Sequence, residues 1–397
     1  MLSLDDALAR LLTHAAPVAS ERVALTDAAG RVLADPRIVA AVDVPAFANS
    51  SMDGFALRAA DAPGTLRVAG ESAAGAGSLP AVEPGTAIRI MTGAPMPPGA
   101  DAVVPVEDVA ESNGVVSIPG SVSAGAFVRM AAHDTRAGDE VRLAGPLSPA
   151  KLAVLASIGL GSVEVRRRPM VAILSTGDEL VAPGDPLRHG QIHDANGPAL
   201  AAAVTEAGGE PLLLPRVGDD PEAIERVLRG VAASADLVVT SGGVSVGRHD
   251  HVRAVLECHG ALDFWRIAVQ PGKPLAVGEL AGTTVIGLPG NPVSALVTFE
   301  LFVRPFVRAM LGLVGDGRAR VRAVVSERIP KDGGRRAFLR VVVDAFHDGY
   351  VARPAGGQQS SQLRPMADAN ALLIVPEGAD AAEPGTAYEA IVLEPLS

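Results

Sequence analysis

Cysteine is nearly absent from this chain, because Cys258 is the only one among its 397 residues. A single cysteine excludes an intrachain disulfide and a zinc site built from several cysteines, so the sequence indicates a reducing compartment. Aromatic residues make up only 3% of the chain, so aliphatic side chains and alanine must fill the core. The rows of rings on which single-stranded nucleic acids stack are therefore also missing.

Positive charge is scarce as well, since 34 Lys and Arg face 45 Asp and Glu, a formal net charge of −11. This balance excludes a general electrostatic attraction to nucleic acid or to an anionic membrane, and any anionic ligand needs a locally basic pocket. No apolar run approaches the ~20 residues that span a bilayer. Asp5 and Asp6 stand where a signal peptide carries positive charge. We expect a cytoplasmic protein that binds neither membranes nor nucleic acid.

The distribution of helical and strand-like patterns predicts four domains. Residues 1–44 and 136–168 are predicted to form a helical and linking domain, in which Ser3 and Asp6 form a capping box for a first helix. Residues 45–135 show short β-type runs between glycine and proline turns, which predicts an inserted β-rich domain. Residues 169–315 alternate strands with helices, and residues 316–397 return to strands typical of a small β-barrel or sandwich.

The region 169–315 is expected to hold the site. Its apolar strands are predicted at residues 171–174, 212–214, 237–239 and 285–288, with helices at 198–207, from 221, at 251–258 and at 293–311. This alternation predicts a mostly parallel sheet covered on both faces. Ligands of such sheets lie beyond the carboxyl ends of the strands, so the loops after these four strands should converge on one crevice.

The most informative segment is DLVVTSGGVSVGRHD, residues 236–250. It joins a buried strand to a turn whose glycines permit sharp bending and whose hydroxyl and N–H groups suit an oxyanion. Asp250, at the far edge, suits a hard cation. The anion-binding candidates are Thr240, Ser241, Gly242, Gly243, Ser245 and Gly247. A tight structural connection remains the alternative interpretation.

Two further strand ends carry carboxylates. Glu179 follows the strand 171–174 beside hydroxyl groups, which suits Mg²⁺, although helix capping is the alternative. Asp219 follows the strand 212–214 and is a candidate to face the crevice, whereas Asp220 is interpreted as a helix N-cap. Asn196, just before the next helix, is interpreted mainly as a cap.

Basic and loop residues complete the crevice. Arg266 and Lys273 lie in a proline-rich segment and are candidates for an anion, with a solvated charge as the alternative for Lys273. The segment Pro289, Gly290, Asn291 offers N–H groups to a phosphate or a base edge. In the β-rich domain, Asp53 and Thr92 lie in polar turns that on their own are typical of hairpin connections.

Several motifs, in their order along the chain, resemble one family. They are DVPAFANSSMDGFALR (43–58), RIMTGAPMPPGADAVVPVED (89–108), ILSTGDEL (173–180), GQIHDANG (190–197), TSGGVSVGRHD (240–250), PGKP (271–274) and LPGNPVSA (288–295). The chain resembles the molybdopterin molybdenumtransferases, the bacterial MoeA family related to the C-terminal domain of gephyrin. The resemblance covers nearly the whole chain, least clearly after residue 315.

The resemblance implies a multidomain α/β and β fold, with a central domain of the molybdopterin-binding type, in an elongated four-domain homodimer with clefts between subunits. It implies an enzyme that inserts molybdenum from molybdate into adenylylated molybdopterin. The adenylate is hydrolysed in a reaction that requires Mg²⁺, and AMP is released. It further implies transient contact with molybdopterin adenylyltransferase and with molybdoenzyme acceptors.

The resemblance also implies residue roles. Glu179, Asp219 and Asp250 are expected to hold the metal, while Asp53 and Thr92 face the site from the other subunit. Asp134 matches an acidic family position and Ser360 a C-terminal hydroxyl. Some family members carry lysines at the positions of Arg266 and Gln270, so Gln270 leaves this pocket with one positive charge fewer.

Two other functions remain open at this stage. Molybdopterin adenylyltransferases resemble residues 169–312 alone, but their loop reads Gly-Gly-Thr-Gly where this chain has Gly242, Gly243, Val244 and Ser245. A scaffold protein that binds partners, as gephyrin does, is the second alternative, and it would combine a peptide-binding groove with an inactive pocket.

Overall fold

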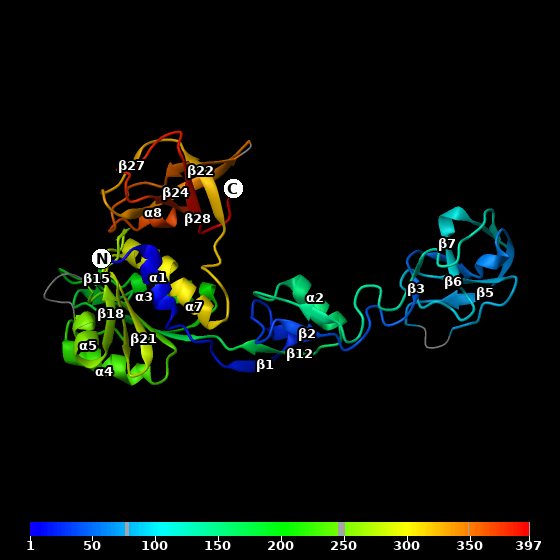
Figure 1. The fold of residues 1–397 in the computed structure, drawn as a ribbon, viewed down its shortest axis with the longest axis horizontal. Helices are drawn as coiled ribbons and strands as arrows, with labels where there is room; N and C mark the ends of the chain where they lie inside the picture. The colour runs from blue at the N-terminus through cyan, green and yellow to red at the C-terminus, as the bar shows by residue number, and fades with distance from the viewer. Residues whose placement is uncertain (76–78, 245–250, 348, 397) are drawn as a thin grey trace. The chain divides into compact units, whose positions relative to one another are not determined.

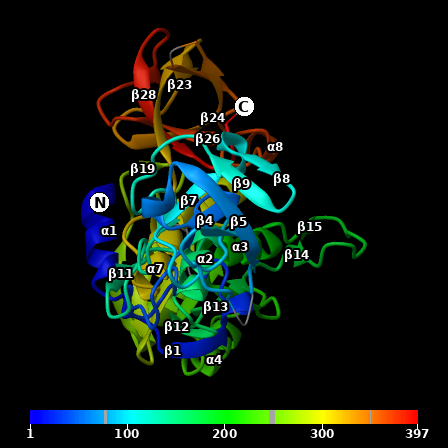
Figure 2. The ribbon, with the colours of Figure 1, turned by 90° about the vertical axis from the view of Figure 1, so that its right-hand side faces the viewer.

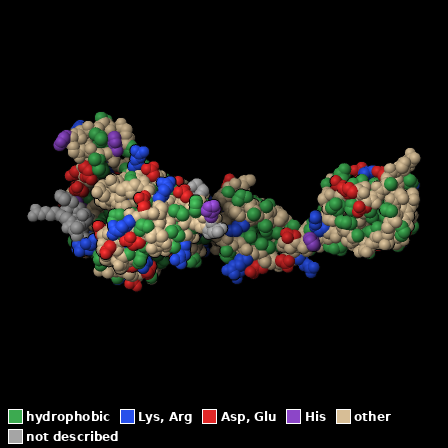
Figure 3. Space-filling view, turned by 90° about the horizontal axis from the view of Figure 1, so that it is seen from above, with side chains coloured by type: hydrophobic (Ala, Val, Ile, Leu, Met, Phe, Trp, Pro, Cys, Tyr) green, Lys and Arg blue, Asp and Glu red, His purple; other side chains and the backbone are tan. Residues whose placement is uncertain are grey.

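The computed structural model describes residues 1–75, 79–244, 251–347 and 349–396. It divides into two compact units. Met1–Glu21 and Arg166–Ser397 form what we call the α/β–barrel unit, and Arg22–Val165 form the β unit. On the face shown in Figure 3, acidic and basic side chains intermingle over the α/β–barrel unit. The finer division into four domains stays a prediction.

The first helix, α1 (Leu4–Leu12), begins where the capping box predicts. The Ser3 hydroxyl accepts a hydrogen bond from the Asp6 amide (3.1 Å) and donates one to the Asp6 carboxylate (2.7 Å). Leu4, Ala7 and Leu11 are buried along one face of the helix. Within the described ranges, none of the helices is long and apolar enough to cross a bilayer.

The central sheet has the strand order β16-β13-β17-β21-β20-β18. The first four strands run parallel, and β20 and β18 are antiparallel to their neighbours, so the predicted mostly parallel sheet is confirmed. The strands are β13 (Met170–Ser175), β16 (Glu210–Leu213), β17 (Leu237–Ser241), β18 (Ala261–Trp265), β20 (Ala276–Leu280) and β21 (Thr283–Leu288). A short pair, β14 (Leu180–Val181) and β15 (Ile192–His193), lies outside this sheet.

Helices cover both faces of the sheet, as the sequence predicts (Figure 1). On one face, Ala172, Leu174 and Val238 pack in one core with residues of α4 and α5. On the other face, α3 packs against β13 and contacts α6 and α7. The helices are α3 (Asn196–Ala207), α4 (Pro221–Ala232), α5 (His251–His259), α6 (Pro292–Thr298) and α7 (Arg304–Met310), with a π-helical segment, Phe299–Val303, joining the last two.

Local chemistry sets the ends of these helices. Gly208 adopts φ = 98° after α3, a conformation that favours glycine and ends the helix. The Asp220 carboxylate accepts a hydrogen bond from the Glu222 amide (3.1 Å), so the predicted N-cap of α4 is confirmed. Pro292 occupies the first turn of α6, where its missing N–H costs nothing.

The C-terminal strands close into a barrel, which confirms the barrel-like prediction. The ring runs β24-β25-β22-β28-β26 and closes because β26 also pairs with β24. Figures 1 and 2 show these strands gathered in one body near the C-terminus. The elements are β19 (Val269–Gln270), β22 (Arg320–Val325), β23 (Ile329–Pro330), β24 (Arg336–Phe346), β25 (Gly349–Pro354), α8 (Arg364–Ala367), β26 (Ala371–Val375), β27 (Ala381–Ala382) and β28 (Ala387–Val392). Inward-facing residues such as Leu339, Val341 and Leu373 form its core.

The β unit contains a mixed six-stranded sheet in the order β7-β4-β6-β5-β9-β8. Phe55 and Leu57 pack on one face of β4 and Ala56 on the other, as strand alternation requires. Ser148 caps α2 (Pro149–Ser157) as predicted. The strands are β1 (Ser20–Ala24), β2 (Arg37–Val39), β3 (Asn49–Ser50), β4 (Gly54–Leu57), β5 (Gly64–Ser72), β6 (Thr86–Ile90), β7 (Ala102–Pro105), β8 (Ala110–Ser112), β9 (Val115–Ile118), β10 (Val128–Arg129), β11 (Glu140–Arg142) and β12 (Ser162–Arg166).

Candidate active site

The loops at the carboxyl ends of the parallel strands enclose a cavity of about 440 Å³. Its walls come from the loops after β13, β16, β17 and β21, so the predicted crevice is confirmed. Of the residues that the structure describes, three carboxylates line it, Glu179, Asp194 and Asp219, and we call it the acidic cavity. The other lining residues are Thr176, Gly177, Leu180, Ile192, His193, Ala195, Asn196, Ser241, Gly242, Gly243, Val244, Pro274, Pro289, Gly290, Asn291 and Pro292.

Gly177 leaves room for the carboxylate of Glu179. Its φ is 147°, and a Cβ added there would lie 2.6 Å from the Glu179 Oε2 atom. The carboxylate of Glu179 therefore lies directly against the Gly177 backbone. The next loop is held by Asp178, whose Oδ1 accepts a hydrogen bond from the Asp219 amide (2.9 Å).

Glu179 and Asp219 carry oxygen atoms of the kind that Mg²⁺ prefers, since Mg²⁺ sites usually combine one or two carboxylates with phosphate and water. The third predicted ligand, Asp250, lies outside the described residues, as do Ser245 and Gly247. Among the residues that the structure describes, no group of three or more His, Cys, Asp or Glu is arranged to hold a metal.

The glycine turn after β17 lies where the sequence predicts it. Ser241, Gly242 and Gly243 line the acidic cavity. Gly242 has φ = 97°, and a Cβ there would lie 2.7 Å from the Thr176 carbonyl oxygen, so only glycine fits without displacement. Thr240 is fully buried and is not among the lining residues. Neighbouring strand residues point to opposite faces, which separates Thr240 from Ser241.

The interpretation of Asn196 as a cap is wrong. Asp194 does this work, because its Oδ1 accepts hydrogen bonds from the amides of Asn196 (3.1 Å) and Gly197 (2.9 Å). The Asn196 side chain instead donates from Nδ2 to the Ser241 hydroxyl (2.6 Å) and to the Gly290 carbonyl (2.7 Å). Asp194 and Asn196 both precede α3 and both have side chains that can cap a helix. No local signal in the sequence therefore shows which of them is the cap.

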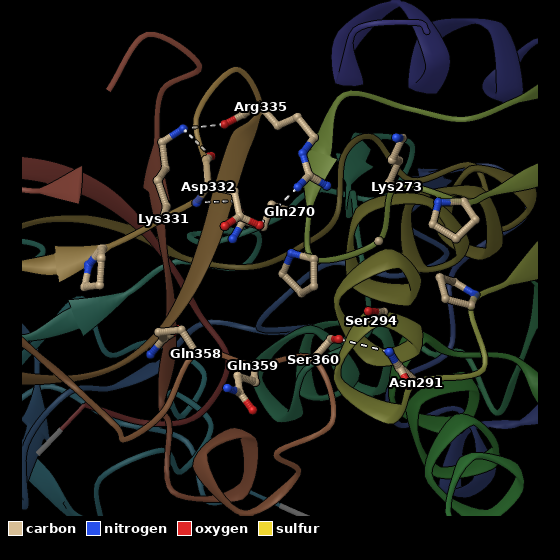
Figure 4. Close-up of a pocket in the computed structure, with 15 residues that line it drawn as sticks. Gln270, Lys273, Asn291, Ser294, Lys331, Asp332, Arg335, Gln358, Gln359 and Ser360 are labelled. Atoms are coloured by element: carbon tan, nitrogen blue, oxygen red, sulfur yellow. Dashed lines mark hydrogen bonds and ion pairs between the residues drawn. The ribbon is translucent and has the colours of Figure 1, made fainter. Parts of the chain in front are cut away.

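A second cavity, of about 660 Å³, adjoins the first and shares Pro274, Pro289 and Asn291 with it. Its described lining holds three cations, Lys273, Lys331 and Arg335, against one carboxylate, Asp332, and we call it the basic cavity (Figure 4). Its other lining residues are Gln270, Pro271, Gly272, Ser294, Pro330, Gln358, Gln359 and Ser360.

Lys331 and Arg335 are lining residues that no sequence motif indicated. Lys331 is 8% exposed, its ammonium donates to the Arg335 carbonyl (2.6 Å), and burial lowers its pKa. It therefore serves to fold the turn between β23 and β24. Arg335 donates to the Val269 carbonyl (3.4 Å) and to the Asp332 carboxylate (3.3 Å). The concentration of basic residues around a Gly-Gly turn was the signal available in the sequence.

Gln270 braces the same turn, because its Oε1 accepts a hydrogen bond from the Asp332 amide (3.1 Å; Figure 4). Lys273 is exposed at the cavity wall, and no hydrogen bond or ion pair joins its ammonium to the described residues. Arg266 does not line either cavity; its backbone amide donates to the Leu275 carbonyl (3.3 Å), with φ = 76°. The structure thus brings Gln270 and Lys273 together and leaves Arg266 apart.

Ser360 reaches the basic cavity on a loop that β24 holds in place. Arg340 is fully buried and donates to the carbonyls of Gly357 (2.9 Å) and Gln359 (3.3 Å). Burial lowers its pKa to about 10. At the loop tip, the Ser360 hydroxyl accepts a hydrogen bond from Asn291 Nδ2 (2.9 Å), which links the barrel to the loop after β21 (Figure 4).

Within the β unit, the structure joins two predicted residues. The Asp53 carboxylate accepts hydrogen bonds from the Thr92 amide (2.6 Å) and the Thr92 hydroxyl (2.8 Å), and these lower its pKa. Asp53 is exposed, so the pair presents a fixed negative charge to solvent. Asp134 is also exposed, and its carboxylate accepts a long hydrogen bond from the Thr135 hydroxyl (3.4 Å).

Comparisons with known proteins cover the whole chain. Residues 2–159 match the model of the MoeA N-terminal region (domain I and II), residues 172–309 the probable molybdopterin binding domain, and residues 322–393 the MoeA C-terminal region (domain IV). Molybdopterin molybdenumtransferase 2 of Mycobacterium tuberculosis is 40% identical over 370 residues, covering 89% of this chain and 90% of that protein. The molybdopterin molybdenumtransferase of Haemophilus influenzae is 38% identical over 369 residues, 91% of each protein.

Solved structures agree with these relatives. Two crystal structures of the molybdopterin biosynthesis protein MoeA from Pyrococcus horikoshii match with TM-scores of 0.85 and 0.84. Their identities are 32% and 28%, and they cover 100% and 99% of this chain and 100% of each of those chains. With the fold, the ordered motifs and the sequence identity all in agreement, this chain belongs to the molybdopterin molybdenumtransferase (MoeA) family.

Proposed function

We propose that this protein inserts molybdenum from molybdate into adenylylated molybdopterin, with Mg²⁺-dependent hydrolysis of the adenylate and release of AMP. The observation that carries the proposal is the pair of adjoining cavities with opposite charge. Carboxylates line one cavity and cations line the other, and Asn291 stands at their shared wall. Such a site suits a ligand with a metal-bridged phosphate at one end and a free oxyanion at the other.

The acidic cavity is the proposed end for the phosphates. Glu179 and Asp219 would hold Mg²⁺ together with Asp250, and Mg²⁺ when bound neutralises charge on phosphate oxygens. Gly242 and Gly243 present backbone at the cavity wall, next to Gly290. These backbone groups would orient the substrate by hydrogen bonds without adding charge to the cavity.

The basic cavity is the proposed end for molybdate. Arg335 is bonded to the Val269 carbonyl and the Asp332 carboxylate, and its remaining N–H groups can donate to a tetrahedral oxyanion. Lys273 adds an exposed point charge at the same cavity. Ser360 adds a hydroxyl on the opposite wall. Lys331 is already bonded to backbone carbonyls, so its charge contributes to the local potential rather than to direct contact. Arg335 thus adds a cation near Gln270, although Asp332 offsets part of its charge.

We further propose a homodimer in which Asp53 and Thr92 of one subunit act at the cavities of the other, with Asp134 nearby. The roles of Asp53 and Thr92 are supported by the family resemblance and by their local geometry. The bonds from Thr92 lower the pKa of Asp53, so this carboxylate keeps its charge at all physiological pH values. We place the reaction in the cytoplasm, where a molybdopterin adenylyltransferase would supply the substrate and molybdoenzymes would take the product.

The test is to incubate the purified protein with adenylylated molybdopterin, Mg²⁺ and molybdate, and to assay AMP and active cofactor. The transferase should release AMP only when Mg²⁺ is present, and cofactor should form only with molybdate. Consumption of ATP in place of the adenylylated substrate would show an adenylyltransferase. Absence of both reactions would leave the scaffold alternative.

A further inference from the structure

We propose that Asn196 is a positioning residue, which holds two substrate loops of the acidic cavity at a fixed spacing. We call Gly242–Val244, after β17, the glycine loop, and Pro289–Asn291, between β21 and α6, the proline loop. The expected effect of Asn196 on the enzyme reaction rests on the proposed function. The tether between the loops is a property of the fold that is testable without any substrate.

One nitrogen atom makes both contacts. Asn196 Nδ2 donates to Ser241 Oγ at 2.6 Å and to the Gly290 carbonyl at 2.7 Å. Ser241 is 2% exposed and immediately precedes the glycine loop, whereas Gly290 is the middle residue of the proline loop. The two hydrogens of the amide group are therefore both used, one for each loop.

An asparagine suits this position better than the similar polar residues. Aspartate has the same shape but no hydrogen to donate to a carbonyl, and serine has a single hydrogen on a shorter side chain. The helix itself makes no demand on the Asn196 side chain, because Asp194 caps the first turn of α3. The Asn196 amide therefore serves the tether and not the helix end.

The loops have little slack around this tether. The Gly242 amide donates to the Leu288 carbonyl (3.1 Å), and a Cβ on Gly290 would lie 3.7 Å from the Gly242 Cα. The residue after Gly290 is Asn291, which lines both cavities and bonds Ser360 (Figure 4). A shift of Gly290 therefore moves Asn291 as well, and changes the wall that the two cavities share.

The experiment compares Asn196→Ala and Asn196→Asp with the wild type, with Thr205→Ala as the control. Thr205 lies on the same helix, and its hydroxyl donates only to the Ala201 carbonyl (3.1 Å). Ser241→Ala and the double variant Asn196→Ala/Ser241→Ala complete a double-mutant cycle. Hydrogen exchange of the free protein and the steady-state kinetics of AMP release are measured for each.

We expect faster amide exchange in both loops of the two Asn196 variants, with unchanged exchange in the rest of α3 and in the Thr205 control. Loss of two hydrogen bonds should raise KM for adenylylated molybdopterin by roughly tenfold, with kcat changed less than about threefold. Ser241→Ala should add little to Asn196→Ala in KM, because both remove the same contact.

Unchanged exchange in both loops would overturn the tether, whatever the enzyme does. If the wild type releases AMP, and the Asn196 variants show faster loop exchange but an unchanged KM, the role of the tether in substrate binding would be overturned. A general rise of exchange over α3, or an equal fall of kcat, would show a merely structural role and would also overturn it. Faster loop exchange in a protein whose wild type releases no AMP would refute the proposed function and leave the tether standing.

Discussion

Replacing Gln270 by lysine tests how the basic cavity is charged. The change adds a cation at a wall that Lys273 and Arg335 already share. It also removes the acceptor for the Asp332 amide, because an ammonium group has no lone pair to offer. The two effects act on different states of the protein, so they are separable by experiment.

In the ligand-free protein, Gln270→Lys should lower the free energy of unfolding. The lost hydrogen bond is worth about 1 kcal/mol, and less where water replaces the acceptor. Two like charges about 6 Å apart repel by about 0.7 kcal/mol in water and about 3 kcal/mol at an effective dielectric of about 20. Because the cavity is open to solvent, we expect the free energy of unfolding of Gln270→Lys to fall by about 1–2 kcal/mol.

In the complex with an anion, Gln270→Lys should strengthen binding. A dianion in the cavity converts the repulsion among the cations into attraction, so we expect Gln270→Lys to bind molybdate up to about tenfold more tightly. The isosteric neutral variant Gln270→Met removes only the acceptor. It should lose about 1 kcal/mol of stability or less, and its affinity for molybdate should not rise.

The assay is denaturant unfolding with and without molybdate, together with calorimetric titration of molybdate, for wild type and both variants. The difference between the lysine and methionine variants isolates the charge, and it should shrink at high salt. Equal molybdate affinity in all three proteins would mean that residue 270 does not face the anion. Wild-type stability of Gln270→Met would mean that the bond to Asp332 contributes nothing.

Three other outcomes are expected. Glu179→Ala and Asp250→Ala should each reduce AMP release at limiting Mg²⁺ by more than the ~10–100-fold typical of changes around a metal site, and wild-type rates there would exclude a metal role. Thr92→Val should raise the pKa of Asp53 towards its ordinary 3.8, as followed by NMR titration. Because the pKa of Asp53 is lowered in the folded state, its carboxylate stabilises the fold at pH values above its ordinary pKa, and this contribution is lost as pH falls through the lowered value. Thr92→Val should therefore weaken the dependence of stability on acid pH. Mixing inactive Asp53→Ala with inactive Asp250→Ala subunits should restore some activity in mixed dimers, and no recovery after confirmed exchange would contradict a site shared across the dimer.

Much of the fold was predictable because its signals are local. The caps at Ser3, Ser148 and Asp220 depend on side chains that bond amides two or three residues away, and each appears as predicted. The crevice was equally predictable, since parallel strands bring their carboxyl ends to one edge. Apolar runs at β13 and β17 located those ends to within a residue or two.

Individual roles within the crevice were less predictable. Thr240 and Ser241 look equivalent in sequence, but the pleat of β17 buries one hydroxyl away from the cavity and leaves the other within hydrogen-bond reach of Asn196. Asn196 matches the composition of a cap, yet Asp194 takes that role. Both outcomes depend on which partner lies closest in space.

The sequence by itself determined the family, the parallel sheet and the place of Glu179 and Asp219 at the strand ends, because motifs, periodicity and strand ends are all properties of short segments. Only the tertiary structure decided the basic half. Arg335 and Ser360 come from the barrel, and Lys273 follows β19, whose pairing with β24 brings this segment beside the barrel. Charges so far apart in the chain carry no common pattern, so their meeting depends on packing alone.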